Sequence, residues 1–290
     1  MTILWLGDEN CHEIERVGGK AANLSRLAAN YRVPPGFCLT PEYYVQWLNG
    51  LEPESSADPT RPLDLKDAVS RGYQEMAVRC GIVDPAVAVR SSALDEDGFS
   101  SSFAGQYDTY LNIKGPEAIS AAIVKCWDSA GGERMRSYRR EHNLTSASLG
   151  IAVLVQQLIS ADVSGVVFSV NPVSGSRDEV MINATWGLGE SLVSGKVTPD
   201  TWIINKSDSR VKDRYLGEKG LMTVLAEGGT KEVDVPRSQR QVLTLDGAQT
   251  REITQLAMDL EREMGWPVDL EFAYHANDLY LLQCRPITTL

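Results

Sequence analysis

The chain has 290 residues, of which 43% are hydrophobic and 23% charged, a composition typical of a globular protein. Its formal net charge of −11 at pH 7 disfavours nucleic acid as a partner, because a phosphate backbone is bound through a basic surface. No stretch approaches the roughly 20 apolar residues that a membrane span needs, and no signal pattern opens the chain, so we expect a cytoplasmic protein. The five cysteines lack CxxC spacing, which argues against a zinc site and a disulfide framework.

The N-terminal part predicts a strand at 3–7 and a helix at 17–30 that opens on Gly18 and Gly19. Lys20 then lies in the first turn of this helix, where its ammonium group adds to the partial positive charge of the helix N-terminus. Such a helix end suits a phosphate group. A plain Gly-Gly turn with a solvated lysine is the alternative that the residues leave open.

The stretch 87–111 predicts two strands joined by a loop dense in serine, glycine and acidic residues. Arg90 is expected at the end of the first strand, so that its guanidinium converges with the hydroxyls of Ser91 and Ser92, a combination that suits phosphate oxygens. Gly105 lets the backbone approach a ligand closely, and Thr109 follows on the second strand. An ordinary polar hairpin loop with a salt-bridged arginine is the alternative.

The remaining elements follow from hydrophobic periodicity and from proline and glycine positions, whereas residues 205–245 carry little pattern. Further helices are expected at 41–48, 63–80, 115–130, 131–143 and 248–264, and further strands at 37–39, 151–159, 164–172 and 179–186. The stretch 187–200 reads as a flexible loop that either covers a nucleotide, with Lys196 reaching a phosphate, or is simply mobile.

The last part of the chain predicts an antiparallel hairpin with strands at 269–274 and 279–285. A three-residue loop places Glu271 opposite Gln283, with Arg285 on the same polar face. Leucine, aromatic and cysteine side chains take the other face, which we expect to pack inward. A carboxylate beside an amide oxygen offers hard ligands for Mg²⁺, and Arg285 then grips a phosphate. A surface salt bridge between Glu271 and Arg285 is the alternative.

Four stretches resemble, in the same order, the motifs of the nucleotide-binding domain shared by phosphoenolpyruvate synthase, pyruvate phosphate dikinase and rifampicin phosphotransferase. They are VGGKAANLSRL at 17–27 with VPPGFCLT at 33–40, VAVRSSALDEDGFSSSFAGQYDTYL at 87–111, WGLGESLVSGKVTPD at 186–200, and DLEFAYHANDLYLLQCRPIT at 269–288. The resemblance implies an α/β (α+β) protein with a two-lobed ATP-grasp-like fold, lobes at 1–155 and 156–290, and the nucleotide cleft between them. It makes Lys20 and Arg285 phosphate contacts and Glu271 and Gln283 magnesium ligands.

The resemblance also places Gln156 where proteins of the ATP-grasp type hold the adenine edge, although two glutamines that simply end a core strand are the alternative. It implies that phosphoryl groups pass from Mg-ATP to a histidine on a separate swivelling domain, with release of AMP, and then to a small acceptor such as pyruvate or an antibiotic. Lys20, Arg90 and Arg285 would act by positioning and charge neutralisation.

None of the three histidines, His12, His142 and His275, lies in the family's phosphohistidine context. We therefore expect the acceptor histidine in another domain of a longer protein or in a separate subunit. Two other functions stay open, namely a self-sufficient ATP-dependent kinase or ligase acting on a small molecule and a nucleotide-binding regulatory module without turnover.

Overall fold

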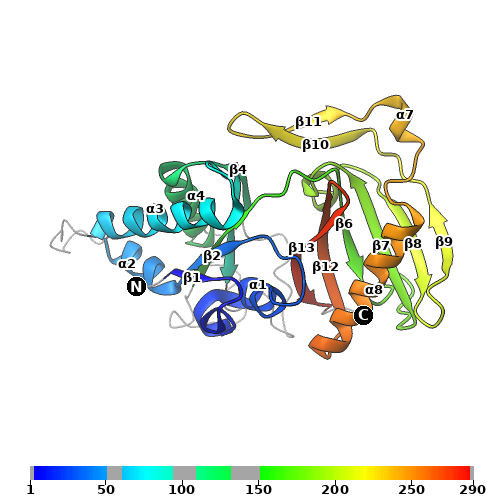
Figure 1. Cartoon of the computed structure of the whole chain (residues 1–290), viewed down its shortest axis with the longest axis horizontal. Helices are drawn as coiled ribbons and strands as arrows, with labels where there is room; N and C mark the ends of the chain where they lie inside the picture. The colour runs from blue at the N-terminus through cyan, green and yellow to red at the C-terminus, as the bar shows by residue number, and fades with distance from the viewer. Residues whose placement is uncertain (1–2, 51–60, 94–108, 132–150, 288–290) are drawn as a thin grey trace. The chain divides into compact units, whose positions relative to one another are not determined.

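The computed structural model describes residues 3–50, 61–93, 109–131 and 151–287, and Figure 1 traces its elements. The chain forms two compact units, the first from 1–30 and 34–158 and the second from 31–33 and 159–290. Each unit combines helices with an antiparallel sheet, so the predicted mixed α/β class is confirmed. The predicted helix at 131–143 and Gly105 lie outside the described residues.

The first unit is built on a five-stranded sheet with the order β1-β2-β5-β3-β4, in which every neighbouring pair is antiparallel. Its strands are β1 (Ile3–Trp5), β2 (Gly36–Leu39), β3 (Val87–Ala93), β4 (Thr109–Ile113) and β5 (Ile151–Gln157). Its helices are the short η1 (Glu9–Cys11), α1 (Ile14–Leu27), α2 (Pro41–Gly50), α3 (Arg61–Cys80) and α4 (Pro116–Gly131).

One face of this sheet packs with α2, α3 and α4 into an apolar core, to which alternate residues of β3 and β5 contribute Val87, Val89, Ile151, Val153 and Val155. Aromatic rings join the helices: Trp127 of α4 lies 6.1 Å from Tyr44 and 5.7 Å from Trp47 of α2, between ring centroids. The opposite face meets α1, since the Ala21 N–H donates to the Ser92 hydroxyl. This second face is therefore the one that carries polar side chains near a helix N-terminus.

The second unit is built on a six-stranded antiparallel sheet with the order β13-β12-β6-β7-β8-β9. Its strands are β6 (Val163–Phe168), β7 (Glu179–Trp186), β8 (Asp200–Asn205), β9 (Val211–Tyr215), β12 (Val268–His275) and β13 (Asp278–Pro286). A separate two-stranded ribbon consists of β10 (Leu221–Ala226) and β11 (Gly229–Asp234), and the helices are α6 (Glu190–Val193), α7 (Arg237–Arg240) and α8 (Gly247–Met264).

Helix α8 covers one face of this sheet (Figure 1). It begins at a capping box, in which the Asp246 side chain accepts from the Gln249 N–H and the Gln249 side chain accepts from the Asp246 N–H. It ends before Gly265, whose φ of 75° suits glycine. Apolar side chains of α8 face the aromatic side of β12, where the Tyr274 hydroxyl donates to Glu252 at 2.7 Å. Glu271 directly precedes Phe272 in β12, so its side chain lies on the opposite face of the sheet.

Within the described residues, no helix combines the length and the apolar character that crossing a bilayer requires.

Candidate nucleotide and metal site

Lys20 lies just after a break in α1, at the place that the glycine pair predicts. Gly18 has φ 75° and ψ 165°, so the helix restarts beyond it and Lys20 falls in the first turn of the new segment. A Cβ atom on Gly18 would lie 2.2 Å from the Ser92 carbonyl oxygen, which only glycine avoids. The sharp approach of α1 to β3 therefore positions the lysine, which is half-buried, at a helix N-terminus.

Arg90 and Thr109 are cross-strand partners of β3 and β4 and share the sheet face that meets α1. Gln156 shares this face as well, because it pairs with Ala88, two residues before Arg90. The first unit thus brings together four predicted nucleotide contacts on one surface: Lys20, Arg90, Thr109 and Gln156.

Two details of the β3 prediction are wrong. The strand continues to Ala93, so Arg90 lies inside it and not at its end. Ser91 consequently points to the core face, where its hydroxyl is buried, whereas Ser92 points to the Arg90 face and accepts from the Ala21 N–H at 3.3 Å. The strand alternation leaves Arg90 with one neighbouring hydroxyl instead of two, and that hydroxyl helps to hold α1.

Gln156 is buried, and its side-chain amide donates to the Pro34 carbonyl at 3.3 Å. This bond is the kind of internal partner that a buried glutamine needs. This hydrogen bond neither supports nor opposes an adenine contact, so the adenine contact of Gln156 stays a prediction.

The β12–β13 hairpin pairs Glu271 directly with Gln283, as predicted, but by a different route. The turn has two residues, Ala276 and Asn277, with φ of 50° and 68°, so the predicted three-residue loop is wrong. A β-bulge then inserts one extra residue, Leu282, and restores the pairing of Glu271 with Gln283.

The bulge also corrects the predicted faces of β13. Leu281 is buried at 2% exposure, whereas Leu282, which we expected to point inward, is only half-buried. Gln283 lies on the predicted face beside Glu271, but its side chain is buried, with 4% exposure. A carboxylate and a fixed amide oxygen at adjacent positions suit Mg²⁺, which takes few protein ligands and keeps several waters or phosphate oxygens.

Arg285 has a partner that the sequence reasoning missed. Its Nε donates to the Asp269 carboxylate at 2.8 Å, across the strand pair in which the two residues face each other. Asp269 stands two residues before Glu271 on the same face and has 8% exposure. The alternation that predicts Glu271 could also have indicated Asp269, because every second residue of a strand shares a face. The charge-assisted bond fixes the guanidinium beside the proposed metal ligands.

No cluster of three or more His, Cys, Asp or Glu side chains with metal-binding geometry occurs in the part of the chain that the structure describes. A structural zinc or calcium site requires such a closed set, whereas a nucleotide-bound Mg²⁺ does not.

The glycine-rich loop that follows β7 is held by the β10–β11 ribbon. The Leu188 N–H donates to the Thr223 carbonyl at 2.8 Å, and the Glu190 carboxylate accepts from the Thr230 hydroxyl at 2.8 Å. Lys196, which we considered for a phosphate, forms an ion pair with Glu232 of β11. The Lys196 side chain is more than half exposed, so its ion pair with Glu232 is a weak surface pair. A phosphate contact of Lys196 would compete with this pair.

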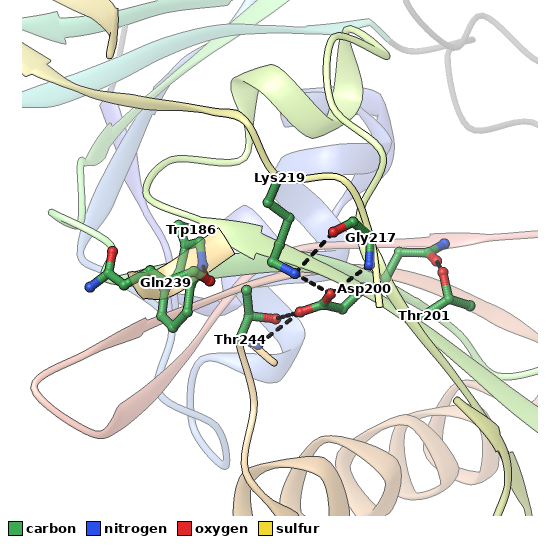
Figure 2. A network of polar contacts seen from close by, with 8 residues as sticks. Trp186, Asp200, Thr201, Gly217, Lys219, Gln239 and Thr244 are labelled. Carbon is green, nitrogen blue, oxygen red and sulfur yellow. Dashed lines mark hydrogen bonds and ion pairs between the residues drawn. The ribbon is translucent and has the colours of Figure 1, made fainter. Parts of the chain in front are cut away.

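A fully buried ion pair anchors the base of this ribbon (Figure 2). The Asp200 carboxylate accepts from Lys219 Nζ and from the N–H groups of Gly217 and Thr244, both at 2.8 Å, and from the Thr244 hydroxyl at 3.0 Å. Three chain segments, at the start of β8, before β10 and before α8, thus converge on one carboxylate. Nothing in the sequence distinguishes Lys219 from the many solvated lysines, so this centre was not predicted.

Comparison with known protein families identifies the family of this chain. The family model described as "Pyruvate phosphate dikinase, AMP/ATP-binding domain" matches residues 54–290. The chain belongs to this family of AMP/ATP-binding domains.

The chain is similar to enzymes that carry different names. A probable phosphoenolpyruvate synthase from Methanocaldococcus jannaschii is 36% identical over 99% of this chain and 27% of its own length. A rifampicin phosphotransferase from Streptomyces sviceus is 35% identical over 99% of this chain and 36% of its own. The prodigiosin synthesizing transferase PigC from Serratia marcescens is 33% identical over 99% of this chain and 33% of its own. The chain therefore spans about a third of the length of these relatives.

Proposed function

We propose that this chain binds Mg-ATP and serves as the nucleotide-binding part of a dikinase-type phosphotransferase. The observation that carries the proposal is the hairpin, in which Glu271 pairs with Gln283 and Arg285 follows on the same face, held by Asp269. Family membership supports nucleotide binding, and the relatives named phosphoenolpyruvate synthase and rifampicin phosphotransferase support phosphotransfer.

In the proposed site, Glu271 and Gln283 hold the magnesium ion, which supplies charge neutralisation of the phosphate oxygens when it is bound. Arg285 and Arg90 offer forked donors to phosphate oxygens, and Lys20 adds a point charge at a helix N-terminus. Thr109, Gln156 and Gly105 complete the proposed nucleotide contacts. None of these groups forms a covalent bond with the substrate, so their contribution is orientation and electrostatic stabilisation.

The acceptor of the phosphoryl group is proposed to be a histidine on a swivelling domain outside this sequence, with release of AMP and onward transfer to a small molecule. His275 sits at the exposed end of β12, 3.9 Å from the Asp162 carboxylate, and His12 follows η1, next to the helix that carries Lys20. Neither lies in a glycine-rich loop of the kind that the resemblance implies for a phosphohistidine. A histidine domain in the same longer protein or in a partner subunit therefore fits better.

The test begins with magnesium-dependent ATP binding. We expect Glu271→Gln, which keeps shape and loses charge, to weaken Mg-ATP binding in calorimetric titration, by about tenfold or more if one ligand is lost. The exposed Glu75→Gln in α3 is the matched control and should bind as the wild type does. Equal affinity in Glu271→Gln and in the wild type would remove the metal assignment.

Product analysis then separates the proposed reaction from its alternatives. Purified chain is incubated with labelled ATP, with and without the histidine domain of a related enzyme. AMP that forms only with the histidine domain supports the proposal. ADP or AMP formed with a small acceptor alone supports a self-sufficient kinase or ligase, and binding without turnover in either mixture supports a regulatory module. Acid-labile label on this chain alone that vanishes in His12→Asn would make the chain its own phosphoacceptor.

A further inference from the structure

A row of cross-strand partners crosses the second sheet on the face that carries Glu271. From β13 to β8 it runs through Gln283, Glu271, Val166, Asn183 and Thr201, and residues directly opposite each other share a face. Every member of this stretch except Val166 is polar. The proposed metal pair thus shares its row with an amide and a hydroxyl from two other strands.

Asn183 is an unusual residue for its position. It lies within β7, a central strand of the sheet, where asparagine is disfavoured because β-branched and aromatic side chains fill such a surface better. Its neighbours along the same face of β7, Met181 and Thr185, are buried, whereas Asn183 is partly exposed. The sheet therefore presents a polar group at a point where its face is open.

The Asn183 amide is held in one orientation. The Thr201 hydroxyl donates to the side-chain oxygen Oδ1 of Asn183 at 2.7 Å. Thr201 directly follows Asp200, whose carboxylate is fixed by the buried ion pair with Lys219 (Figure 2). Among the residues that the structure describes, none accepts a hydrogen bond from the Asn183 NH₂ group, so both of its N–H donors remain for a ligand.

The chemistry of this group decides what it can bind. The amide oxygen, which is the atom that could ligate a cation, already accepts from Thr201. The remaining NH₂ group is a donor, so it suits an anionic oxygen and not the magnesium ion itself. Only β6 separates Asn183 from Glu271, which places their backbones about 10 Å apart at about 4.8 Å per strand. A chain of phosphate groups that starts at the metal can span this gap above Val166.

We infer that Asn183 is a further phosphate-binding residue, which donates from its NH₂ group to a phosphate oxygen of the magnesium-bound nucleotide, with Thr201 as its positioning residue. The inference rests on the proposed function, because it takes the magnesium ion to lie at Glu271 and Gln283. The contact belongs to the β- or γ-phosphate, since these are the groups that magnesium bridges. A nucleotide with a single phosphate therefore gains no affinity from Asn183.

The test uses the full chain with Asn183→Leu, Asn183→Asp and Thr201→Val, titrated calorimetrically with ATP, ADP and AMP at saturating Mg²⁺. Asn183→Leu removes the donors at similar volume, and Asn183→Asp keeps the acceptor for Thr201 but puts a negative charge in place of the donors. Asn205→Leu is the matched control, because Asn205 lies on the same face of β8, four residues or about 13 Å beyond Thr201. Thermal unfolding of each variant reports whether the fold is intact.

In Asn183→Leu we expect ATP and ADP to bind about tenfold or more weakly, the usual cost of losing a hydrogen bond to a charged group, and AMP to bind as in the wild type. Asn183→Asp should bind ATP more weakly still, because its charge repels the phosphates. Thr201→Val should show a smaller loss with the same preference among the nucleotides. An ATP affinity of Asn183→Leu equal to that of the Asn205→Leu control would overturn the inference, as would equal losses for ATP and AMP.

The Glu271→Gln variant separates this inference from the proposed function. If Glu271→Gln weakens Mg-ATP binding and Asn183→Leu does not, the inference alone fails. If the wild type binds no Mg-ATP, the proposed function fails and the inference fails with it. A cross-strand pair with a purely structural role would lower the melting temperatures of Asn183→Leu and Thr201→Val and leave the nucleotide affinities unchanged, which would also overturn the inference.

Discussion

The buried pair of Asp200 and Lys219 should be costly to break, because both side chains have 0% exposure and no water can replace a lost partner. Lys219→Met removes the cation and leaves the Asp200 charge with only the neutral donors of Gly217 and Thr244. Removing one partner of a buried ion pair costs about 3–5 kcal/mol. We therefore expect Lys219→Met to lower the free energy of unfolding of the second unit by an amount in this range.

The measurement is urea unfolding of the full chain, followed by circular dichroism and by fluorescence, since Trp186 and Trp202 lie in the same unit. Arg262→Met is the control, because its partner Asp259 lies at the surface of α8 and such pairs contribute about 0–1 kcal/mol. The double variant Asp200→Asn/Lys219→Met removes both charges and keeps a side-chain acceptor. It should be more stable than Lys219→Met alone, because no uncompensated charge remains buried.

A cost in Lys219→Met no larger than that in the Arg262→Met control would refute this reasoning. It would mean that water or neighbouring groups compensate the Asp200 charge when its partner is lost. A double variant that is less stable than Lys219→Met would refute the electrostatic part alone, because it would show that the hydrogen bonds of the carboxylate dominate. The slope of unfolding against urea must stay constant across the variants for the comparison to hold.

Two further outcomes follow from single positions. Gly18→Ala should destabilise the first unit in thermal unfolding more than Gly81→Ala does. Both residues have positive φ, which costs alanine about 1–2 kcal/mol, but only at Gly18 would the added Cβ meet a backbone oxygen. Equal melting temperatures in the two variants would contradict the clash. Glu179→Gln should cost more stability at neutral pH than in acid below the folded pKa of this carboxyl, because Lys212 and Asn171 lower the pKa of the Glu179 carboxyl in the folded chain. The contribution of a carboxylate with a lowered pKa is complete above its unfolded value and is lost as the pH falls through the folded value, so a pH-independent difference would contradict it.

The elements that the sequence predicted well are those that bury one clear face. Helix α8 was predicted within a residue of its observed start, because its apolar residues recur at helical spacing along one face. Residues 205–245 carried little pattern, since β9 has two mostly exposed faces and the β10–β11 ribbon lies outside the sheet, so neither shows a clean alternation. The Asp200–Lys219 pair could not be predicted for a different reason. Whether a lysine is buried depends on the residues that pack around it in the fold, and its neighbours in sequence do not show this.

The hairpin shows how a correct pairing can follow from an incorrect local structure. Assuming a three-residue loop shifts the register by one residue, and the bulge at Leu282 shifts it by one residue as well, so both routes place Glu271 opposite Gln283. The predicted pairing therefore rested on the assumed loop length, and the bulge restores the same pairing in the structure. The two routes differ between the turn and the bulge, where the assumed loop puts Leu282 inward and the structure buries Leu281 instead. A bulge is a local departure from the regular ladder, and the alternation of apolar and polar residues within the hairpin carries no trace of it.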